Sequence, residues 1–269
     1  MPPFRRLRGA IAAYLFAVVG VGYLLRTGLK PVTENCFLNS AVEHLSQFTE
    51  DATVFEAFYE LPLKCDGVVV EMGGLDGRTY SNSWFFQYAL NWRALLVEAL
   101  PDNYEKMLVN RPDATNVFGA ICPGKSITFL TGRDPATGGG AKDMSEGHQK
   151  TWTNENSTLV EVPCMLMPAV FKKHGIKHVD LFILDVEGGE LTVLETFDWK
   201  VRINIFVVEM DGSNPKKDEA VRQLLHGRQY VTPFSMFDEC KKRIAYCLPN
   251  EIFVLKKIAD RYFYDATQS

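Results

Sequence analysis

Short runs of apolar, β-branched residues alternate with stretches of helix-like apolar spacing from residue 66 to the end of the chain. The spacing predicts strands at 67–71, 94–98, 116–120, 179–185 and 202–210, and helices at 81–90, 103–110, 191–197 and 218–226. The run at 179–185 is almost continuously apolar, as in a strand buried on both faces. Strands that alternate with helices in this way predict a doubly wound, mostly parallel α/β sheet.

The two ends of this pattern differ from its centre. The last strands, 229–234 and 251–255, follow one another without a crossover helix, so we expect them to pair antiparallel. Upstream of the sheet, residues 31–65 form a stem in which apolar residues recur at helical spacing. These residues are Val42, Leu45, Phe48, Val54, Phe55 and Phe58. We therefore expect N-terminal helices that pack onto the main domain, residues 66–269.

A polar, glycine-rich stretch at residues 131–158 interrupts the alternation of strands and helices. It shows no apolar periodicity, and such long loops inside a compact domain are usually functional lids or disordered segments. The interpretation that we favour is a mobile lid over a substrate.

The N-terminus, residues 1–30, carries an apolar run from Gly9 to Leu25 that follows three arginines. At about 1.5 Å per residue this run reaches roughly 25 Å, near the thickness of a thin bilayer core. The arginines keep the N-terminus cytoplasmic. The run predicts a single-pass type II signal anchor that places the main domain in the lumen of the Golgi or endoplasmic reticulum. A cleaved signal peptide is the alternative.

Charge and cysteine content narrow the class of protein further. Residues 1–30 hold five of the 29 basic groups and none of the 33 acidic ones, so the remainder carries a formal charge of −9. An acidic domain of this kind argues against a nucleic-acid partner. The six cysteines allow several disulfide pairings in an oxidising lumen, Cys240 with Cys247 being the most local. None lies in a Cys-x-x-Cys pattern, so no metal site is expected. Asn156 begins an Asn-Ser-Thr glycosylation sequon.

Acidic residues follow the predicted strands at the places where ligands bind in open α/β sheets. They are Glu71, Glu98, Asp185 and Glu209. The turn after the first strand contains Gly73, Gly74 and Gly77, which permit a ligand to lie against the backbone. Glu98 follows Gly73 by 25 residues, near the usual offset of an acidic residue that binds ribose hydroxyls. The turn is shorter than a dinucleotide-binding turn, so an adenosine cofactor without phosphates, S-adenosylmethionine, fits better.

Asp185 and Glu187 lie at the mouth of the central predicted strand, beside Gly188 and Gly189. A hydroxyl that accepts a methyl group needs a destination for its proton, and a nearby carboxylate can act as the general base. Asp185 is the first candidate for this role and Glu187 the second. Glu209 either contacts the acceptor or braces Asp185.

The same segments resemble the FkbM-type methyltransferase family over residues 66–210. The resemblance is carried by VVVEMGGLDGRTYSNS, LLVEALPDNYEKMLVNRP, VDLFILDVEGGELTVLETFDW and IFVVEM. It implies a class I methyltransferase (Rossmann-like) fold that uses S-adenosylmethionine to methylate hydroxyl groups, often of sugars. It also implies that the cofactor contacts Glu71, Gly73, Gly74, Gly77 and Glu98, and that Asp185 and Glu187 face the acceptor.

Two positions depart from the family's frequent pattern, Glu71 where Asp is usual and Leu75 where Asn is usual. They support an alternative, a non-catalytic type II membrane protein that uses a degenerate methyltransferase fold for binding or trafficking. A nicotinamide-dependent oxidoreductase is less favoured, because the chain shows no Tyr-x-x-x-Lys pair or similar hydride-transfer residues. The expected function is O-methylation of a sugar or glycan-like acceptor.

Overall fold

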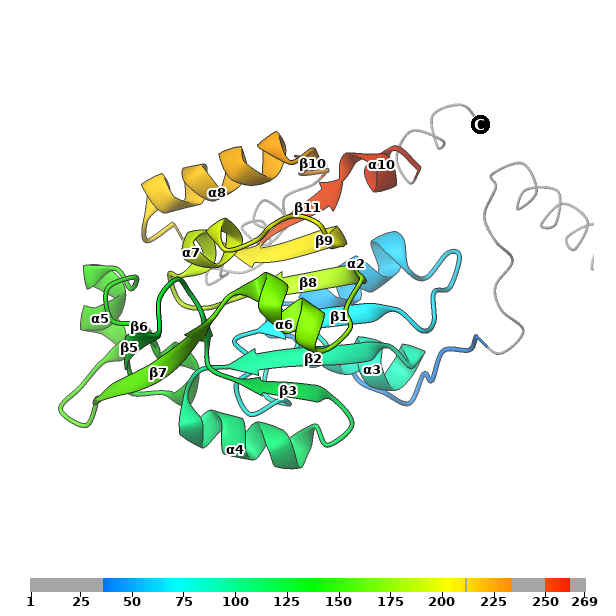
Figure 1. Ribbon diagram of the computed structural model, residues 1–269. Helices are drawn as coiled ribbons and strands as arrows, with labels where there is room; N and C mark the ends of the chain where they lie inside the picture. Colours follow the sequence, from blue (N-terminus) through cyan, green and yellow to red (C-terminus); the bar gives the residue numbers. More distant parts are fainter. Residues whose placement is uncertain (1–35, 211, 234–249, 262–269) are drawn as a thin grey trace, which may run out of the picture. The chain divides into compact units, whose positions relative to one another are not determined.

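A seven-stranded sheet forms the centre of the protein, with strand order β10-β11-β9-β8-β1-β2-β3 (Figure 1). The computed structural model describes residues 36–210, 212–233 and 250–261, and residues 38–269 belong to one compact unit. The strands are β1 (Val68–Met72), β2 (Arg93–Glu98), β3 (Thr115–Phe118), β8 (His178–Leu184), β9 (Arg202–Glu209), β10 (Tyr230–Val231) and β11 (Asn250–Leu255). The five predicted parallel strands are confirmed.

The direction of the last strand is also confirmed. β11 lies between β9 and β10 and is antiparallel to both, whereas β1, β2, β3, β8 and β9 pair parallel. The residues that connect β10 to β11 lie mostly outside the described ranges. The sheet is therefore the expected class I methyltransferase type, mostly parallel with one antiparallel strand.

Helices cover both faces of this sheet (Figure 1). They are α2 (Glu50–Phe58), α3 (Trp84–Leu90), α4 (Pro101–Asn110), α6 (Met167–Lys173), α7 (Glu190–Glu195), α8 (Pro215–Gly227) and α10 (Lys256–Ala259). Proline occupies the first turn of α4, α6 and α8, where its missing N–H removes no helical hydrogen bond. The Asn214 side chain caps α8 by accepting from the Lys217 N–H at 3.2 Å.

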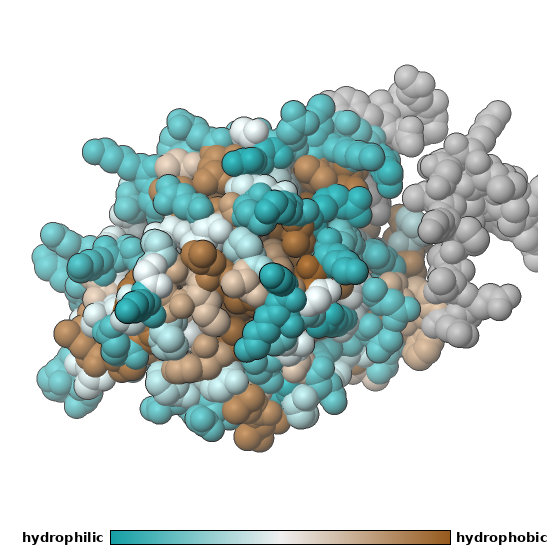
Figure 2. Space-filling model, viewed as in Figure 1, coloured by the Kyte–Doolittle hydropathy of each residue, from teal (hydrophilic) through white to brown (hydrophobic). Residues whose placement is uncertain are grey.

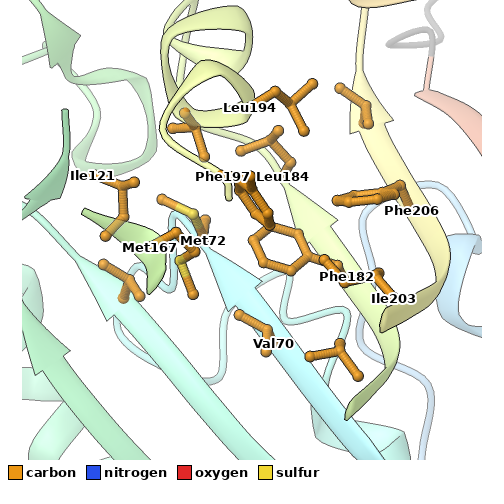
Figure 3. Packing of buried hydrophobic residues seen from close by; sticks show 14 of the residues in the cluster. Val70, Met72, Ile121, Met167, Phe182, Leu184, Leu194, Phe197, Ile203 and Phe206 are labelled. Atoms are coloured by element: carbon orange, nitrogen blue, oxygen red, sulfur yellow. The ribbon is translucent and has the colours of Figure 1, made fainter. Parts of the chain in front are cut away.

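Alternating strand residues divide the core into two layers. Val70 and Met72 of β1 point to the layer that contains α6, α7 and α8, and Figure 3 shows Val70, Met72, Phe182, Leu184 and Phe206 packed within it. Val69 points to the other layer, with α2, α3, α4 and α10. Because successive strand residues face opposite sides, a strand covered on both faces must be apolar throughout. This requirement explains the uninterrupted apolar run in β8.

The expected lid at residues 131–158 is more ordered in structure than the sequence indicated. It contains the short 3₁₀ helix η1 (Pro135–Thr137), β6 (Gly139–Gly140) and helix α5 (Glu146–Trp152). β6 belongs to a second, four-stranded sheet with order β4-β7-β5-β6, which also comprises β4 (Ala120–Ile121), β5 (Ser126–Leu130) and β7 (Leu159–Met165). These strands were missed because each is short or half-exposed, and their register comes from pairing with one another rather than from apolar periodicity.

The prediction of N-terminal helices is half right. Val54, Phe55 and Phe58 lie on α2, but no helix forms between residues 36 and 49. There the Asp51 carboxylate accepts from the Leu45 N–H at 3.1 Å and from the Ser46 hydroxyl at 2.5 Å. A side chain that binds the backbone of this segment offers it an alternative to helical hydrogen bonds. The helix-like spacing of Val42, Leu45 and Phe48 was therefore misleading.

The outer surface is mostly hydrophilic on the face drawn in Figure 2. Apolar atoms gather over α4, which carries the exposed residues Leu108 and Val109. No helix in the described ranges is long and apolar enough to cross a membrane. The expected anchor at residues 9–25, and Cys240 and Cys247, lie outside the described residues.

Candidate functional site

A large cavity opens beyond the carboxyl ends of β1, β2, β8 and β9. It encloses about 1140 Å³ together with its mouth. β1 lies between β2 and β8, so the chain order reverses at this point and the cavity occupies the topological switch point, where ligands bind in open α/β sheets.

Glu71, the fourth residue of β1, lines the cavity but is engaged by its own chain. Its Oε1 accepts from the Asn82 N–H at 2.7 Å. Its Oε2 accepts from the Ser81 hydroxyl at 2.8 Å and from both the N–H and the hydroxyl of Ser83. A carboxylate offers about four acceptor sites. The Glu71 carboxylate therefore has little free capacity to accept from a cofactor ammonium group, the contact that the sequence predicted.

Arg111, directly after α4, is fully buried and supplies the positive charge opposite Glu71. Its guanidinium donates to the Ser81 hydroxyl at 3.0 Å, the Ser83 hydroxyl at 3.1 Å, the Gly77 carbonyl at 2.9 Å and the Gln87 side chain. Burial lowers the pKa of Arg111, and the charge of Glu71 opposes this shift. Sequence analysis missed this residue, because it follows a helix in a polar segment without any motif.

The three glycines of the β1 turn have different surroundings. Gly73 has φ +77°, and a Cβ there would lie 1.9 Å from the Asp185 carbonyl oxygen, so it brings two strand-end turns together beside the cavity. A Cβ on Gly74 would lie 2.8 Å from the Met107 sulfur, and one on Gly77 would lie 2.6 Å from Arg111 Cγ. Gly74 and Gly77 thus allow α4 to pack closely against the turn, and neither lines the cavity.

Glu98, the last residue of β2, is the buried carboxylate at the other end of the turn. Its Oε2 accepts from the Leu75 N–H at 2.8 Å and its Oε1 from the Leu100 N–H at 2.7 Å. Burial raises its pKa to about 7, although these hydrogen bonds oppose the shift. Leu75 has φ 49°, a left-handed conformation that Asn adopts more readily. Leu75, which stands where the family usually has Asn, therefore keeps the hydrogen bond from its N–H to Glu98.

Asp185, Glu187 and Glu209 come together at the mouth of β8 and β9. Each offers one carboxylate oxygen, and the three oxygens lie within 4.8 Å of one another. Burial, ahead of all other causes, raises the pKa of Asp185 to about 7. Burial also raises the pKa of Glu209 well above its usual value, and the adjacent Asp185 charge adds to the shift. Asp185 and Glu187, which were predicted to face an acceptor, line one end of the cavity together with Glu209, which was predicted to contact the acceptor or to brace Asp185.

Glu190 holds the turn that carries Glu187 in place. Its side chain is fully buried and accepts from the N–H groups of Val186 and Gly188 at 3.3 and 3.1 Å. Lys217 donates to its other oxygen at 2.6 Å. The sequence analysis did not identify this role. Only the contact with Lys217, 27 residues away on α8, distinguishes Glu190 from an ordinary acidic residue in the first turn of a helix.

The lid closes over the same turn. His148 of α5 places Nδ1 at 3.3 Å from the Glu187 carboxylate, and its Nε2 lies 3.2 Å from the Thr137 carbonyl oxygen. A Cβ on Gly188 would lie 2.6 Å from the Asp143 carbonyl oxygen, so the lid backbone packs directly on the turn. His148 thus contacts the acceptor end of the cavity through Glu187.

The end of the cavity near β2 is mainly apolar. Leu100, Ile121 and Phe129 line it, and they come from the start of α4 and from the second sheet. A disulfide joins Cys122, directly after β4, to Cys164 of β7, with a Cα–Cα distance of 5.2 Å. The cavity therefore has an apolar end beside Glu98 and an acidic end beside Asp185.

The chain is similar to two solved methyltransferase structures at low sequence identity. A TehB-like SAM-dependent methyltransferase from Corynebacterium glutamicum is 9% identical, with a TM-score of 0.41, over 77% of this chain and 87% of that chain. Precorrin-6y C5,15-methyltransferase from Geobacter metallireducens is 13% identical, with a TM-score of 0.38, over 80% and 93%. No curated protein matches the sequence.

The sequence itself matches a protein family over the segments that build the cavity. The family model described as the methyltransferase FkbM domain matches residues 71–232. This range begins at Glu71 and includes Glu98, Asp185, Glu187 and Glu209. Because the match spans more than half of the chain, the protein belongs to the FkbM methyltransferase family.

Proposed function

We propose that the protein is an S-adenosylmethionine-dependent O-methyltransferase that acts on a hydroxyl group of a sugar or glycan-like acceptor. The observation that carries this proposal is the polarity of one cavity. Its apolar end carries Glu98, and its other end carries the cluster of Asp185, Glu187 and Glu209. The first end suits an adenosine, and the second suits a group that must lose a proton.

Glu98 retains the acceptor capacity that ribose hydroxyls require. The N–H groups of Leu75 and Leu100 each take one acceptor site on a different oxygen, and a carboxylate oxygen can accept two. The Ala99 N–H and the Asn103 side chain also lie close enough to this carboxylate to lower its pKa. Leu100, Ile121 and Phe129 offer an apolar surface for the base. When bound, S-adenosylmethionine supplies a methyl group on a positively charged sulfur. Glu71 holds the turn through its serine contacts, so we assign it a positioning role rather than a direct contact.

Asp185 is placed to take the proton of the acceptor hydroxyl. A pKa of about 7 makes the side chain an effective base near neutral pH. With S-adenosylmethionine bound, the acceptor oxygen would take the methyl group, the sulfur would keep the electron pair of the broken bond, and the Asp185 carboxylate would take the hydroxyl proton. His148 and Glu187 hold the lid over this point and limit the access of water.

The two departures that support a non-catalytic protein both have structural explanations. Glu71 reaches the serines that Arg111 also binds, and Leu75 adopts the left-handed conformation with its N–H bonded to Glu98. Neither departure displaces Glu98 or the acidic end of the cavity, so the two substitutions alone do not favour the non-catalytic alternative.

Methyl transfer to sugars tests the proposal directly. The full-length chain, purified in mild detergent, is mixed with methyl-tritiated S-adenosylmethionine and a panel of glycosides and neutral oligosaccharides. We expect base-stable label on at least one acceptor, because an ether survives alkali and a methyl ester does not. The matched control is the same sugar with the target hydroxyl replaced by hydrogen. Absence of label on every sugar would contradict a glycan acceptor.

We further propose that the domain faces the lumen of the Golgi or endoplasmic reticulum, anchored through residues 9–25. Among the described residues no cysteine is free, which suits an oxidising compartment. Asn156 is exposed in the turn between α5 and β7, as a glycan acceptor must be. Digestion with an N-glycosidase is expected to lower the mass of the protein from cells, and an Asn156→Gln variant is expected to show no change. An unglycosylated Asn156 in the wild-type protein would count against this topology.

A further inference from the structure

A second hollow, which we call the outer hollow, lies between helix α3 and the segment that precedes α2. Its lining combines polar and aromatic side chains and includes Asn39, Glu43, Arg78, Trp84 and Tyr88. The Asn39 N–H donates to the Ala89 carbonyl at 2.9 Å, which fixes the segment against α3. The proposed contacts with the cofactor and with the acceptor hydroxyl use none of these lining residues. Sequence analysis did not identify the outer hollow, because its lining comes from three separate stretches of the chain.

Two aromatic rings form the apolar part of the outer hollow. Trp84 and Tyr88 are one helical turn apart on α3, and their ring centroids lie 4.4 Å apart. Both side chains are half-buried. The guanidinium of the buried Arg111 lies 5.6 Å from each centroid and holds the two rings in place. Rings held in this way offer a flat, partly exposed apolar surface, which suits the C–H face of a sugar ring.

The polar groups around these rings include both hydrogen-bond donors and acceptors. The Arg78 guanidinium lies 5.3 Å from the Trp84 centroid, and Glu43 lines the same hollow. Within the described residues, neither Arg78 nor Glu43 forms an ion pair. A hydroxyl donates and accepts hydrogen bonds, so a guanidinium and a carboxylate together suit a molecule that is rich in hydroxyls. Because their two charges cancel, the outer hollow favours a neutral ligand over an ionic one.

The outer hollow adjoins the catalytic cavity along two stretches of the chain. Arg78 and Leu45 line the hollow, and Tyr80 and Gln47, each two residues further on, line the cavity. The Cα atoms of residues two apart lie within about 7 Å of one another. Tyr80 is 49% exposed and has φ 59°, a conformation that is rare for an aromatic residue and is typical of functional sites. A ligand that leaves the cavity past Tyr80 therefore reaches the outer hollow directly.

We propose that the outer hollow binds the further units of a neutral oligosaccharide, whose end unit places the acceptor hydroxyl in the catalytic cavity. This proposal rests on the proposed function and narrows its acceptor from a single sugar to a chain of sugars. Trp84 and Tyr88 contact the sugar rings, Arg78 and Glu43 bind their hydroxyls, and Tyr80 contacts the chain between the two sites. A chain that occupies both sites makes the second contact intramolecular, so longer chains bind more tightly.

Saccharide binding without a methyl donor tests the proposal independently of activity. The full-length chain, in mild detergent, is titrated against mono-, di- and tetrasaccharides of mannose, galactose and glucose, and the dissociation constants are obtained from the saccharide NMR signals. We expect the tetrasaccharide of at least one series to bind about 10-fold more tightly than its monosaccharide, or better. Absence of binding by every tetrasaccharide, or equal affinity at all lengths, would overturn the proposal.

Arg78→Ala tests the outer hollow itself. The variant is expected to weaken binding of that tetrasaccharide by about 10–100-fold, because hydrogen bonds from a charged donor are lost. Arg228→Ala is the matched control, since Arg228 is also exposed and also lies over a tryptophan ring, 5.0 Å from the Trp199 centroid, but lines neither site. It is expected to bind as the wild type does. Unchanged affinity in Arg78→Ala would contradict the assignment of this hollow.

Glu43→Gln distinguishes a neutral ligand from an acidic one. With a neutral chain, the substitution weakens one acceptor and is expected to lower the affinity for the tetrasaccharide by about 2–10-fold. With an acidic chain, it would remove a repulsive charge and raise the affinity. The same titration with a tetrasaccharide that contains a uronic acid provides the comparison. Tighter binding of this acidic chain, lost at high salt, would overturn the assignment of a neutral ligand.

Methyl-transfer kinetics separate this proposal from the proposed function. We expect the KM for the acceptor to fall with chain length at constant kcat, because the added contacts are equal in the ground state and the transition state. Methyl transfer with the same KM for monosaccharide and tetrasaccharide would keep the proposed function and remove the outer hollow as a saccharide site. Length-dependent binding that Arg78→Ala abolishes, without methyl transfer to any sugar, would keep the saccharide site and remove the proposed function.

Discussion

Asp185→Asn is expected to lower the rate of methyl transfer by about 10²–10⁴-fold, the usual contribution of a positioned general base. The amide keeps the size of the side chain and removes its ability to take the hydroxyl proton. Because Asp185 lies at the acidic end of the cavity, opposite the apolar end beside Glu98, the affinity for S-adenosylmethionine is expected to stay close to that of the wild type. The labelled-methyl assay and a cofactor titration measure the two quantities separately.

Asp198→Asn is the matched control for this variant. Asp198 lies in the segment after α7, is exposed, and contacts Lys200 rather than the cavity. The control is expected to transfer methyl groups at the wild-type rate. A wild-type rate in Asp185→Asn would remove this side chain as the base and pass the role to Glu187.

Arg111→Met is expected to lower the free energy of unfolding by about 3–5 kcal/mol, the usual cost of removing one partner from a buried charge pair. Arg111 is fully buried, and it is joined to Glu71 through the hydroxyls of Ser81 and Ser83. The variant leaves the Glu71 charge buried without its counterpart. Denaturant unfolding of the wild type and of Arg111→Met measures the difference in the free energy of unfolding.

Two further variants test the cause of this loss. Lys106→Met removes a positive charge from an exposed position of α4, the helix that Arg111 follows, and is expected to change stability by no more than about 0.5 kcal/mol. The double variant Glu71→Gln with Arg111→Met is expected to lose less stability than the sum of the two single variants, because the two charges compensate one another. Strict additivity would show that Arg111 acts only through its neutral hydrogen-bond acceptors.

The sheet was predictable because its strands must be apolar on both faces. β8 shows this most clearly, since its uninterrupted apolar run marks both its position and its central place in the sheet. The strand ends followed from the same pattern, so Glu98, Asp185 and Glu209 were recognised as the residues that meet at one edge. Parallel pairing places the carboxyl ends of the strands at one edge of the sheet, regardless of the conformation of the loops. This part of the site could therefore be predicted from the sequence alone.

The parts that sequence analysis missed depend on contacts between distant residues. The role of Arg111 depends on its hydrogen bonds to Ser81 and Ser83, and the role of Glu190 depends on its contact with Lys217. Neither residue belongs to a periodic pattern, so composition and spacing do not distinguish them from surface charges. The short strands of the second sheet were missed for the same reason, because a strand such as β6 has only two residues.

Titration of the full-length chain with S-adenosylmethionine by calorimetry tests the central claim most directly. We expect saturable binding by the wild type. In Glu98→Gln one carboxylate oxygen is replaced by an NH₂ group, which cannot accept a hydrogen bond. The loss of hydrogen bonds worth about 1–3 kcal/mol is expected to weaken binding by about 10–100-fold. Glu105→Gln, an exposed change on α4, is expected to bind as the wild type does. Absence of binding by the wild type, or unchanged affinity in Glu98→Gln, would contradict the assignment of this cavity as the cofactor site.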